Sequence, residues 1–251
     1  MEIPLLKMYG ERNTGTNYLA RLIGLNLEVE QIPGVVPDFI RNLQRILPGE
    51  ELVRDIYFGI TFSRNLGWKH SLVKAPEKLA EYRICAKGVS FVTLTKNPYS
   101  WLLSLYRNPY HQYWKSKPDF ENFLGSPWRN VGRDNTPREF SSPVELWNRK
   151  NVSYMLLCSD FPTLNLRYED LLENPQVTLE KIAERFSYQW KNGEFVNFND
   201  STKEKSKDFA FYRDYYLEEN WKTELSPRSI EIINSLLDGQ VMDYFGYSRL
   251  P

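Results

Sequence analysis

Apolar and polar residues are grouped along the chain so that short strands and amphipathic helices are predicted in alternation. Ile3 to Met8 is a short apolar run, and Asn17 to Leu27 carries apolar residues near helical spacing. Val89 to Thr95 is apolar and rich in β-branched residues, which is typical of a buried parallel strand. Thr163 to Arg167 predicts a further short strand.

Proline marks the start of several predicted helices, because its fixed φ suits the first helical turn. The predicted helices are 34–62 with Pro and Gly breaks, 98–107, 143–158, 175–188 and, as the last of the chain, 227–237. Residues 66–70 are expected to end a strand. Strands that alternate with helices predict an α/β fold with a central parallel sheet flanked by helices on both faces. Ligands of such sheets bind at the carboxyl ends of the strands.

The length of 251 residues fits one such domain with a full core, so residues 1–251 are expected to form a single domain. The stretch 108–143 is rich in Pro, Asn, Arg and Trp and predicts a long excursion, either a lid or a substrate loop. Aromatic residues make up 15% of the chain, which is compatible with a pocket lined by rings. The sequence contains no internal repeat and no low-complexity tract.

The charge balance argues against general nucleic-acid or membrane binding, since Lys+Arg and Asp+Glu both number 32. Cys85 and Cys158 are too few for a disulfide framework, and their apolar contexts predict two reduced, buried thiols. Met1 leads directly into the first strand, and no apolar run is long enough to span a bilayer. We therefore expect a cytoplasmic protein.

The turn after the first strand carries the most informative motif. Gly10 and Gly15 have the spacing of the nucleotide-phosphate loop G-x-x-x-x-G-K-S/T. Glycine lets the backbone approach an anion closely, and amide groups at the following helix N-terminus bind negative charge. Thr16 and Asn17 replace the Lys and the metal-binding Ser or Thr of that motif. The loop is therefore predicted to bind a phosphate or sulfate ester without Mg²⁺, the alternative being an ordinary strand–turn–helix junction.

Three segments together resemble the superfamily of sulfotransferases that use 3′-phosphoadenosine-5′-phosphosulfate (PAPS). Residues 12–19, Arg-Asn-Thr-Gly-Thr-Asn-Tyr-Leu, resemble its 5′-phosphosulfate loop. Residues 96–101, Lys-Asn-Pro-Tyr-Ser-Trp, continuing to Ser104, resemble its 3′-phosphate motif, in which a basic residue precedes a Ser by eight positions. Residues 167–175 match its Y-E-D-L-x-x-N-P segment. The resemblance spans about residues 3–188 and implies the P-loop-like sulfotransferase fold.

The resemblance also implies contacts to PAPS. Lys96 on a strand tip and Ser104, about two helical turns later, would converge on the 3′-phosphate. Tyr18 and Tyr168 lie near the family's adenine-contact positions, although Tyr18 equally suits the core. The 5′-phosphosulfate contacts are expected from Asn13, Thr14, Gly15, Thr16 and Asn17.

The loop departs from the family pattern at one position. The residue two places before the Gly-Thr pair is usually Lys or Arg, but here it is Asn13, and the cation is Arg12. Either Arg12 reaches the bridging oxygen from a longer loop, or Asn13 donates a hydrogen bond while another cation assists. Lys69 is the candidate for that second cation.

His70 is the candidate general base. It follows Lys69 in a Trp-Lys-His sequence that resembles some bacterial sulfotransferases, and a neutral histidine accepts a hydroxyl proton at about pH 7. His111, in the excursion, is the weaker candidate, and Glu11 is a further possible base. The alternative interpretation of His70 is a loop histidine that makes a backbone hydrogen bond.

The sequence thus predicts transfer of a sulfuryl group from PAPS to a hydroxyl or amine acceptor. A P-loop nucleotide kinase and a catalytically degenerate nucleotide-binding relative are the alternatives. The acceptor is not specified, and no nucleic-acid or membrane partner is expected; the oligomeric state is left open. Residues of the excursion that suit either an acceptor wall or a surface loop are Tyr110, Tyr113, Trp114, Trp128, Arg129, Arg133 and Arg138.

Overall fold

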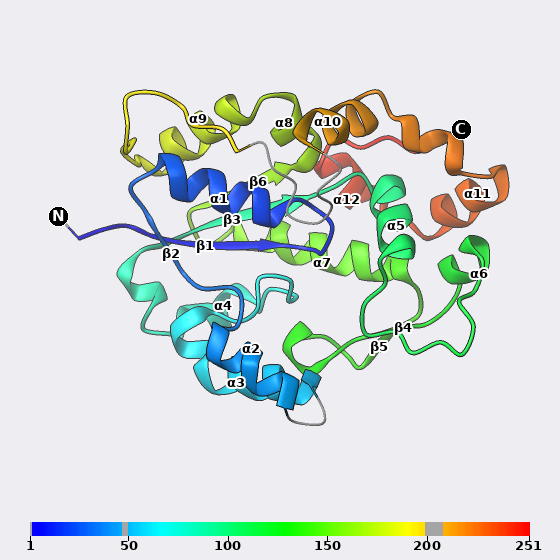
Figure 1. Cartoon of the computed structure of the whole chain (residues 1–251), viewed down its shortest axis with the longest axis horizontal. Coiled ribbons are helices and arrows are strands. Elements are labelled where there is room, and N and C mark those ends of the chain that lie inside the picture. The colour runs from blue at the N-terminus through cyan, green and yellow to red at the C-terminus, as the bar shows by residue number, and fades with distance from the viewer. Residues whose placement is uncertain (1, 47–49, 199–207) are drawn as a thin grey trace.

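The computed structural model describes residues 2–46, 50–198 and 208–251. Its centre is a sheet of four parallel strands in the order β2-β1-β3-β6 (Figure 1). These strands are β1 (Leu5–Gly10), β2 (Glu30–Gln31), β3 (Val89–Thr95) and β6 (Thr163–Arg167). Gly10 is level with Leu94, and Thr95 with Arg167, so the carboxyl ends of β1, β3 and β6 meet at one edge of the sheet.

Helices flank this sheet, as the alternating pattern predicts. In Figure 1, α1, α8 and α9 lie above the strands, whereas α2, α3 and α4 lie below them. The helices are α1 (Thr16–Asn26), α2 (Asp38–Ile46), α3 (Glu50–Asn65), α4 (Pro76–Ala80), α5 (Pro98–Arg107), α6 (Phe120–Leu124), α7 (Pro143–Leu157), α8 (Tyr168–Glu173), α9 (Pro175–Phe186), α10 (Phe209–Leu217), α11 (Pro227–Leu236) and α12 (Gly239–Tyr244). Short 3₁₀ helices are η1 (Cys85–Lys87), η2 (Gly132–Asp134) and η3 (Asn220–Glu224). The expected single α/β domain with a central parallel sheet is confirmed.

Local sequence explains why these elements begin where they do. Every residue of β3 is buried, which accounts for a sequence that is apolar or β-branched at all positions but Ser90. Four helices begin with a capping side chain followed by Pro at the first helical position, and the cap accepts a hydrogen bond from a backbone N–H of the first turn. These caps are Asn97, Ser142, Asn174 and Ser226. The predicted strands at 89–95 and 163–167 are confirmed with the same bounds.

The prediction that residues 66–70 end a strand is wrong, since they form a loop after α3. Leu66 and Gly67 have φ of 56° and 85°, and this left-handed backbone excludes an extended strand. Lys7, fully buried in β1, donates to the carbonyls of Asn65 at 2.5 Å and Gly67 at 2.6 Å. A side chain of the central strand therefore fixes this loop against the sheet.

Two further predictions are corrected by the C-terminal region and by the cysteines. The helix at 227–237 is not the last, because Asp238 caps α12 by accepting from Gln240 N–H. Both cysteines are free, but Cys85 is only half-buried and Cys158 is exposed beside the hydroxyl of Tyr244. None of the described helices is long and apolar enough to cross a membrane.

The excursion at 108–143 is packed rather than extended from the domain. It contains α6, η2 and a small antiparallel pair formed by β4 (Trp128–Arg129) and β5 (Glu139–Phe140). Phe123, Leu124 and Trp128 are buried in the main core, which explains the aromatic content of this stretch. Its first residues, 108–110, line the cavity described in the next section.

Candidate functional site

The turn between β1 and α1 is a close-packed glycine loop. A Cβ atom at Gly10 would lie 2.6 Å from Thr16 Cγ2 and 2.9 Å from the Leu94 carbonyl oxygen, so only glycine fits. Asn13 and Gly15 have φ of 65° and 80° and turn the chain into α1. Gly15 caps α1 without a side-chain hydrogen bond, and the first turn of that helix carries no acidic residue. The amides of this turn therefore face no competing negative charge from the helix itself.

Arg12 extends from this loop into an aromatic slot. Its guanidinium lies 5.0 Å from the Trp68 ring centroid and 4.1 Å from that of Tyr110. Trp101 Nε1 donates to the Arg12 carbonyl at 2.9 Å and fixes its backbone. Within the described parts of the chain, no carboxylate pairs with this guanidinium. Arg12 is therefore a positioned cation that can take up an anionic ligand.

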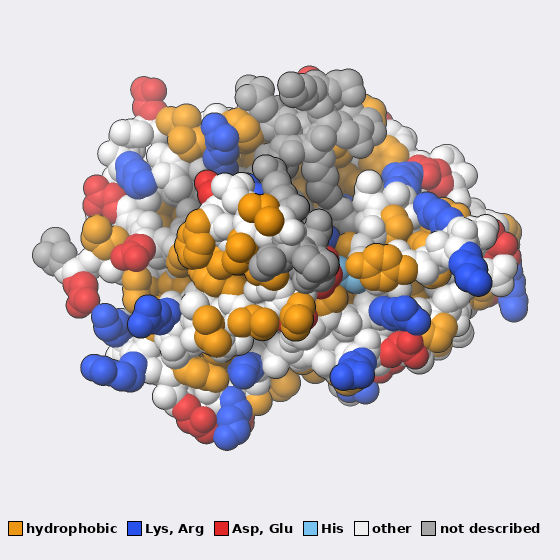
Figure 2. Space-filling view, turned by 60° about the horizontal axis from the view of Figure 1, so that its bottom comes forward, with side chains coloured by type: hydrophobic (Ala, Val, Ile, Leu, Met, Phe, Trp, Pro, Cys, Tyr) orange, Lys and Arg blue, Asp and Glu red, His pale blue; other side chains and the backbone are white. Residues whose placement is uncertain are grey.

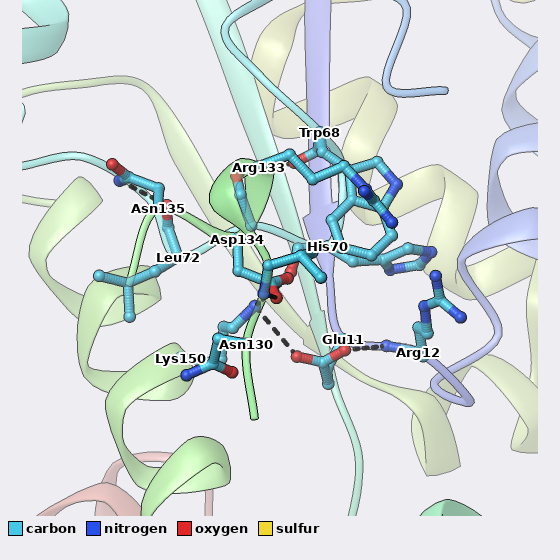
Figure 3. Close-up of polar contacts among 12 residues, drawn as sticks. Glu11, Arg12, Trp68, His70, Leu72, Asn130, Arg133, Asp134, Asn135 and Lys150 are labelled. Carbon is cyan, nitrogen blue, oxygen red and sulfur yellow. Dashed lines mark hydrogen bonds and ion pairs between the residues drawn. The ribbon is translucent and has the colours of Figure 1, made fainter. Parts of the chain in front are cut away.

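Glu11, the adjacent carboxylate, is already engaged in a buried network (Figure 3). Its Oε1 accepts from Arg12 N–H and from the Tyr110 hydroxyl, each at 2.6 Å. Its Oε2 lies 3.1 Å from Lys150 Nζ, which also lies 3.9 Å from Asp134 and donates to the His70 carbonyl. Both carboxylate oxygens have partners, so the geometry does not favour Glu11 as a base.

His70 lies at the end of β1, in the loop after α3. Its Nδ1 is 2.5 Å from the Gly10 carbonyl oxygen, which only accepts, so Nδ1 carries the proton and Nε2 is an acceptor. Burial, and the nearby charge of Lys69, lower the pKa of His70 well below its ordinary value. A second contact ties the loop to β1, since Gly10 N–H donates to the Lys69 carbonyl at 2.9 Å. The ring is thus neutral and oriented.

Lys69 lies beside the start of α1. Its Nζ donates to Asn17 Oδ1, which joins the loop after α3 to the first turn of α1. Burial, with the charge of Arg12 nearby, lowers the pKa of Lys69 to about 8. Two cations thus lie around the glycine loop, Arg12 from the loop itself and Lys69 from outside it.

Lys96 and Ser104 come together, as their spacing predicts, since Lys96 Nζ donates to Ser104 Oγ at 3.0 Å. The ammonium is buried and lies 3.7 Å from the Tyr216 ring centroid. The Tyr216 hydroxyl is 3.2 Å from Ser104 Oγ. Burial lowers the pKa of Lys96 well below its ordinary value, and the charge of Glu169 offsets part of that effect. Among the described residues no carboxylate pairs directly with this ammonium, which would gain from an anionic partner.

Aromatic rings of α1, α8 and α10 surround this second cation. Tyr168 packs against Gly15, so that a Cβ there would lie 2.4 Å from the ring. The Tyr18 ring faces Phe209 at 5.5 Å, and its hydroxyl donates to Asn197 Oδ1 at 2.8 Å. Tyr168 and Tyr216 meet edge to face at 5.2 Å. These rings form an aromatic wall beside the glycine loop.

Most of the predicted site residues line one cavity of about 970 Å³, at the upper end of the range for small-molecule sites. Among the described residues, its wall includes the cations Arg12, Arg41, Arg54, Lys69 and Arg107 but neither Asp nor Glu. The cavity is therefore suited to a ligand with several negative charges. The predicted site residues in its wall are Arg12, Asn13, Gly15, Thr16, Asn17, Tyr18, Lys69, His70, Ser104 and Tyr168.

Two predicted site residues lie behind the wall rather than in it. The Thr14 hydroxyl donates to the Glu11 carbonyl at 2.6 Å, so it holds the shape of the loop. Lys96 is covered by Tyr216 and contacts residues of the wall, among them Ser104 and Tyr216, without being in the wall itself.

The excursion supplies fewer site residues than its composition suggests. Of its predicted aromatic residues, Tyr110 lines the cavity, whereas Trp128 is buried in the core and Tyr113 is 78% exposed. His111 and Arg133 both pair with Glu51 of α3. The imidazole of His111, the weaker candidate base, is therefore engaged with a carboxylate. Trp114, Arg129 and Arg138 are likewise not among the residues of the described cavity wall.

Sequence reasoning missed the ring wall of α10 and the buried partner of Glu11. The run Phe209-Ala-Phe-Tyr-Arg-Asp-Tyr-Tyr216 places rings three and four residues apart, a spacing that signals one helical face. Lys150 offers no such signal, because its two carboxylate partners are remote in sequence. Arg107, which lines the cavity while paired with Glu224, was also missed.

No protein-family model matches the chain, and no curated protein matches it either. Among solved structures, mouse sulfotransferase SULT7A1 complexed with PAP is similar to this chain, with 15% identity and a TM-score of 0.48. The alignment covers 94% of this chain and 84% of the mouse protein's chain. The sulfotransferase domain from the curacin biosynthetic pathway covers 100% of both chains, with 14% identity and a TM-score of 0.45. The sulfotransferase domain from the Synechococcus PCC 7002 olefin synthase covers 99% of this chain and 95% of its own, with 14% identity and a TM-score of 0.43. At these identities the likeness is one of overall fold.

Proposed function

We propose that the protein transfers a sulfuryl group from PAPS to a hydroxyl- or amine-bearing acceptor. The observation that carries this proposal is the convergence of two groups at one sheet edge. Lys96 and Ser104 lie 3.0 Å apart, with Lys96 beside the Asn13 carbonyl of the glycine loop, and Lys69 and His70 contact Asn17 and Gly10 next to Arg12. A donor that carries phosphates on the 3′ and 5′ oxygens of its ribose requires two anion sites, and a described cavity wall without Asp or Glu suits its charge.

The residues present fit this donor in detail. The glycine loop and the first turn of α1 offer backbone amides to the 5′-phosphosulfate. The buried Lys96 and Ser104 would hold the 3′-phosphate, and Tyr18 and Tyr168 would contact the adenine. Thr16 and Asn17 stand where a nucleoside-triphosphate loop has its Lys and Ser or Thr, so the alternative of a P-loop kinase lacks its central residues.

The reaction follows from the groups around His70. Nε2 accepts the acceptor's proton as its oxygen or nitrogen forms a bond to sulfur, and the bond from sulfur to the bridging oxygen breaks. Arg12 and Lys69 are placed to stabilise the negative charge that develops on that leaving oxygen. The departing group, adenosine 3′,5′-bisphosphate, keeps its contacts with the loop and with Lys96. Asn13, for its part, is a hydrogen-bond donor at the turn of the loop.

Adenosine 3′,5′-bisphosphate is expected to stabilise the fold without added metal. A ligand at about 100 times its dissociation constant adds about 2.7 kcal/mol to the free energy of unfolding. Thermal unfolding with the bisphosphate plus a chelator is the measurement, with ATP and Mg²⁺ as the comparison. A rise in melting temperature with ATP and Mg²⁺ alone would favour the kinase alternative.

Lys96→Ala is expected to weaken bisphosphate binding more than Ser104→Ala. A hydrogen bond from a charged donor contributes about 1.5–3 kcal/mol, against about 1 kcal/mol for a neutral one. Isothermal titration should also show that Lys96→Ala no longer distinguishes adenosine 3′,5′-bisphosphate from adenosine 5′-monophosphate. Lys87→Ala, at an exposed lysine, is the matched control. Unchanged discrimination in Lys96→Ala would remove Lys96 from the 3′-phosphate site.

Binding of the bisphosphate is expected to take up a proton through Lys69. Because the pKa of Lys69 is lowered to about 8, a fraction of its side chains is neutral at that pH, and an anion beside it raises the pKa again. Titration at about pH 8 in buffers of different ionisation enthalpy should give an uptake to which Lys69 contributes roughly half a proton. The uptake should therefore be smaller by about that amount in Lys69→Met, and the remainder belongs to other groups, among them Lys96, whose pKa is also lowered by burial. An uptake that is equal in Lys69→Met and the parent protein would contradict this role of Lys69.

A nucleotide-binding protein without transferase activity is the second candidate, because Asn13 stands where the family pattern has the Lys or Arg that neutralises the leaving oxygen. Such a protein would show the bisphosphate binding described above. It would not transfer labelled sulfate from PAPS to any acceptor in a panel of alcohols, sugars and amines, and that assay distinguishes the two candidates.

A further inference from the structure

One arm of the cavity lies away from the ring wall and is apolar. Val36, Phe58 and Trp68 form a buried cluster of their own, separate from the main core, with 8%, 3% and 6% exposure. The same three side chains, with Val35, line the cavity. Trp68 lies edge-on to His70, with 5.0 Å between ring centroids. The apolar arm therefore begins beside the group that we assign as the base.

The arm continues onto an exposed apolar face of α2 and α3. Figure 2 shows hydrophobic side chains gathered over these helices, with a histidine in the hollow at their edge. Val35, in the cavity wall, is itself 47% exposed and joins the two regions. Six further side chains repeat at helical spacing and are 42–78% exposed, namely Phe39, Leu43 and Ile46 on α2 and Leu52, Ile56 and Ile60 on α3. An apolar face of this kind marks a binding surface.

The arm is held firmly in place by a buried arginine of the excursion. Arg133 Nη1 lies 2.8 Å from Asp55, and Nη2 pairs with Glu51, both on α3. Burial alone would raise the pKa of Glu51, but His111 and Arg133 together lower it to about 2. The Arg133 guanidinium also lies 4.6 Å from the Trp68 ring centroid. The first half of α3 is thus a fixed wall of the cavity.

The charge of this arm restricts what it can hold. Arg41 of α2 and Arg54 of α3 belong to the same cavity wall, and the described wall has no Asp or Glu. A ligand with a cationic head would therefore meet repulsion, whereas a neutral or anionic head would not. The apolar side chains, in turn, favour a ligand that carries hydrocarbon.

We propose, on the basis of the proposed function, that the acceptor is an amphiphile with a neutral or anionic hydroxyl-bearing head and an alkyl chain. The head lies beside His70, and the chain passes over Val36 and Phe58 and leaves the cavity at Val35 onto α2 and α3. The apolar side chains run without a break from Trp68, beside His70, to the outer face of α2 and α3, and this continuity favours an acceptor that carries an alkyl chain. A second copy of the chain, or a bilayer, would cover the outer face but leave the inner arm beside Trp68 without a ligand.

Isothermal titration of the bisphosphate-bound protein with glucose, hexyl β-glucoside and octyl β-glucoside, all as monomers, tests this assignment. Octyl glucoside should bind with a one-to-one stoichiometry, and glucose should bind too weakly to measure. Affinity should increase about 4- to 15-fold from hexyl to octyl, the range for two methylenes half or fully removed from water. The same glucosides, tested with labelled PAPS, should show a Michaelis constant that falls with chain length.

Val35→Ser and Phe39→Ser should each reduce this dependence on chain length, and the double variant should abolish it. Leu156→Ser, at a side chain that is 51% exposed on α7, is the matched control and should behave as the parent protein. Affinity that is independent of chain length, or unchanged in the double variant, would overturn the proposal. Binding of the parent protein to phosphatidylcholine vesicles without glucoside that is lost in the double variant would assign this face to a bilayer and would also overturn the proposal. Titration of the bisphosphate alone reports separately on the proposed function.

Discussion

Turnover of PAPS is expected to fall by about 10²–10⁴-fold in His70→Ala, the usual cost of removing a general base. Binding of adenosine 3′,5′-bisphosphate should remain close to that of the parent protein, because the imidazole contacts the Gly10 carbonyl rather than a phosphate. The measurement pairs transfer of labelled sulfate with a bisphosphate titration on the same protein sample. If turnover and bisphosphate binding decreased together, His70 would be a residue that stabilises the loop rather than a base.

His70→Asn separates the two roles of the ring further. The asparagine amide can still donate to the Gly10 carbonyl, but it offers no base at the position of Nε2. The proposed role predicts that His70→Asn is as slow as His70→Ala, whereas recovered turnover would show that only the hydrogen bond matters. His111→Asn is the histidine control, since His111 is paired with Glu51, and it should retain most of the turnover.

The pH dependence of turnover provides an independent check on His70. Because burial lowers the pKa of this imidazole well below its ordinary value, the base form is already present throughout the neutral range. Turnover should therefore not decrease between about pH 8 and about pH 6.5, the interval in which an exposed histidine becomes protonated. A decrease with a midpoint at the ordinary histidine value would contradict the buried, oriented ring.

Lys150→Met is expected to lower the free energy of unfolding by about 3–5 kcal/mol, the cost of leaving buried charges without their partner. Glu11 and Asp134 share this cation, and both are at least nine-tenths buried (Figure 3). Unfolding in urea is the measurement. Arg149→Met, at the neighbouring residue, is the control, because its pair with Glu145 is exposed and contributes little.

A lower pH should partly restore the free energy of unfolding that is lost in Lys150→Met. Burial raises the pKa of Asp134, and the charge of Lys150 offsets part of that effect, so without Lys150 the folded-state pKa of Asp134 lies still further above the unfolded value. The loss of stability is then largest at high pH and shrinks as the pH falls through the raised pKa. Lys150→Met/Glu11→Gln should recover part of the loss at neutral pH. A loss below about 1 kcal/mol in Lys150→Met would mean that water reaches the pair.

The parts of the fold that depend on local sequence could be predicted. Val89 to Thr95 forms a strand because every position but Ser90 is apolar or β-branched and the strand is buried on both faces. Lys96 and Ser104 meet because Asn97 and Pro98 start a helix directly after the strand, which fixes the path between them. The glycine loop could be found because Gly10 and Gly15 have no substitute in so close a turn.

The parts that depend on distant contacts could not be predicted. The sequence predicts that residues 66–70 end a strand. Lys7 of β1, however, donates to the carbonyls of Asn65 and Gly67 and stabilises this segment as a loop. Nothing within a few residues of Lys150 indicates that it pairs with Glu11 and Asp134. The roles of Arg133 and His111 also depend on α3, which is more than fifty residues earlier in the chain.

The position of Tyr216 over Lys96 has a consequence for the kinetics of nucleotide exchange. A phosphate that contacts both Lys96 Nζ and Ser104 Oγ takes the place of the Tyr216 hydroxyl, and Tyr216 belongs to α10. Entry of the nucleotide and departure of the product would then both require Tyr216 to move away from Lys96. Association would therefore reach a constant rate at high nucleotide concentration, set by the movement of Tyr216.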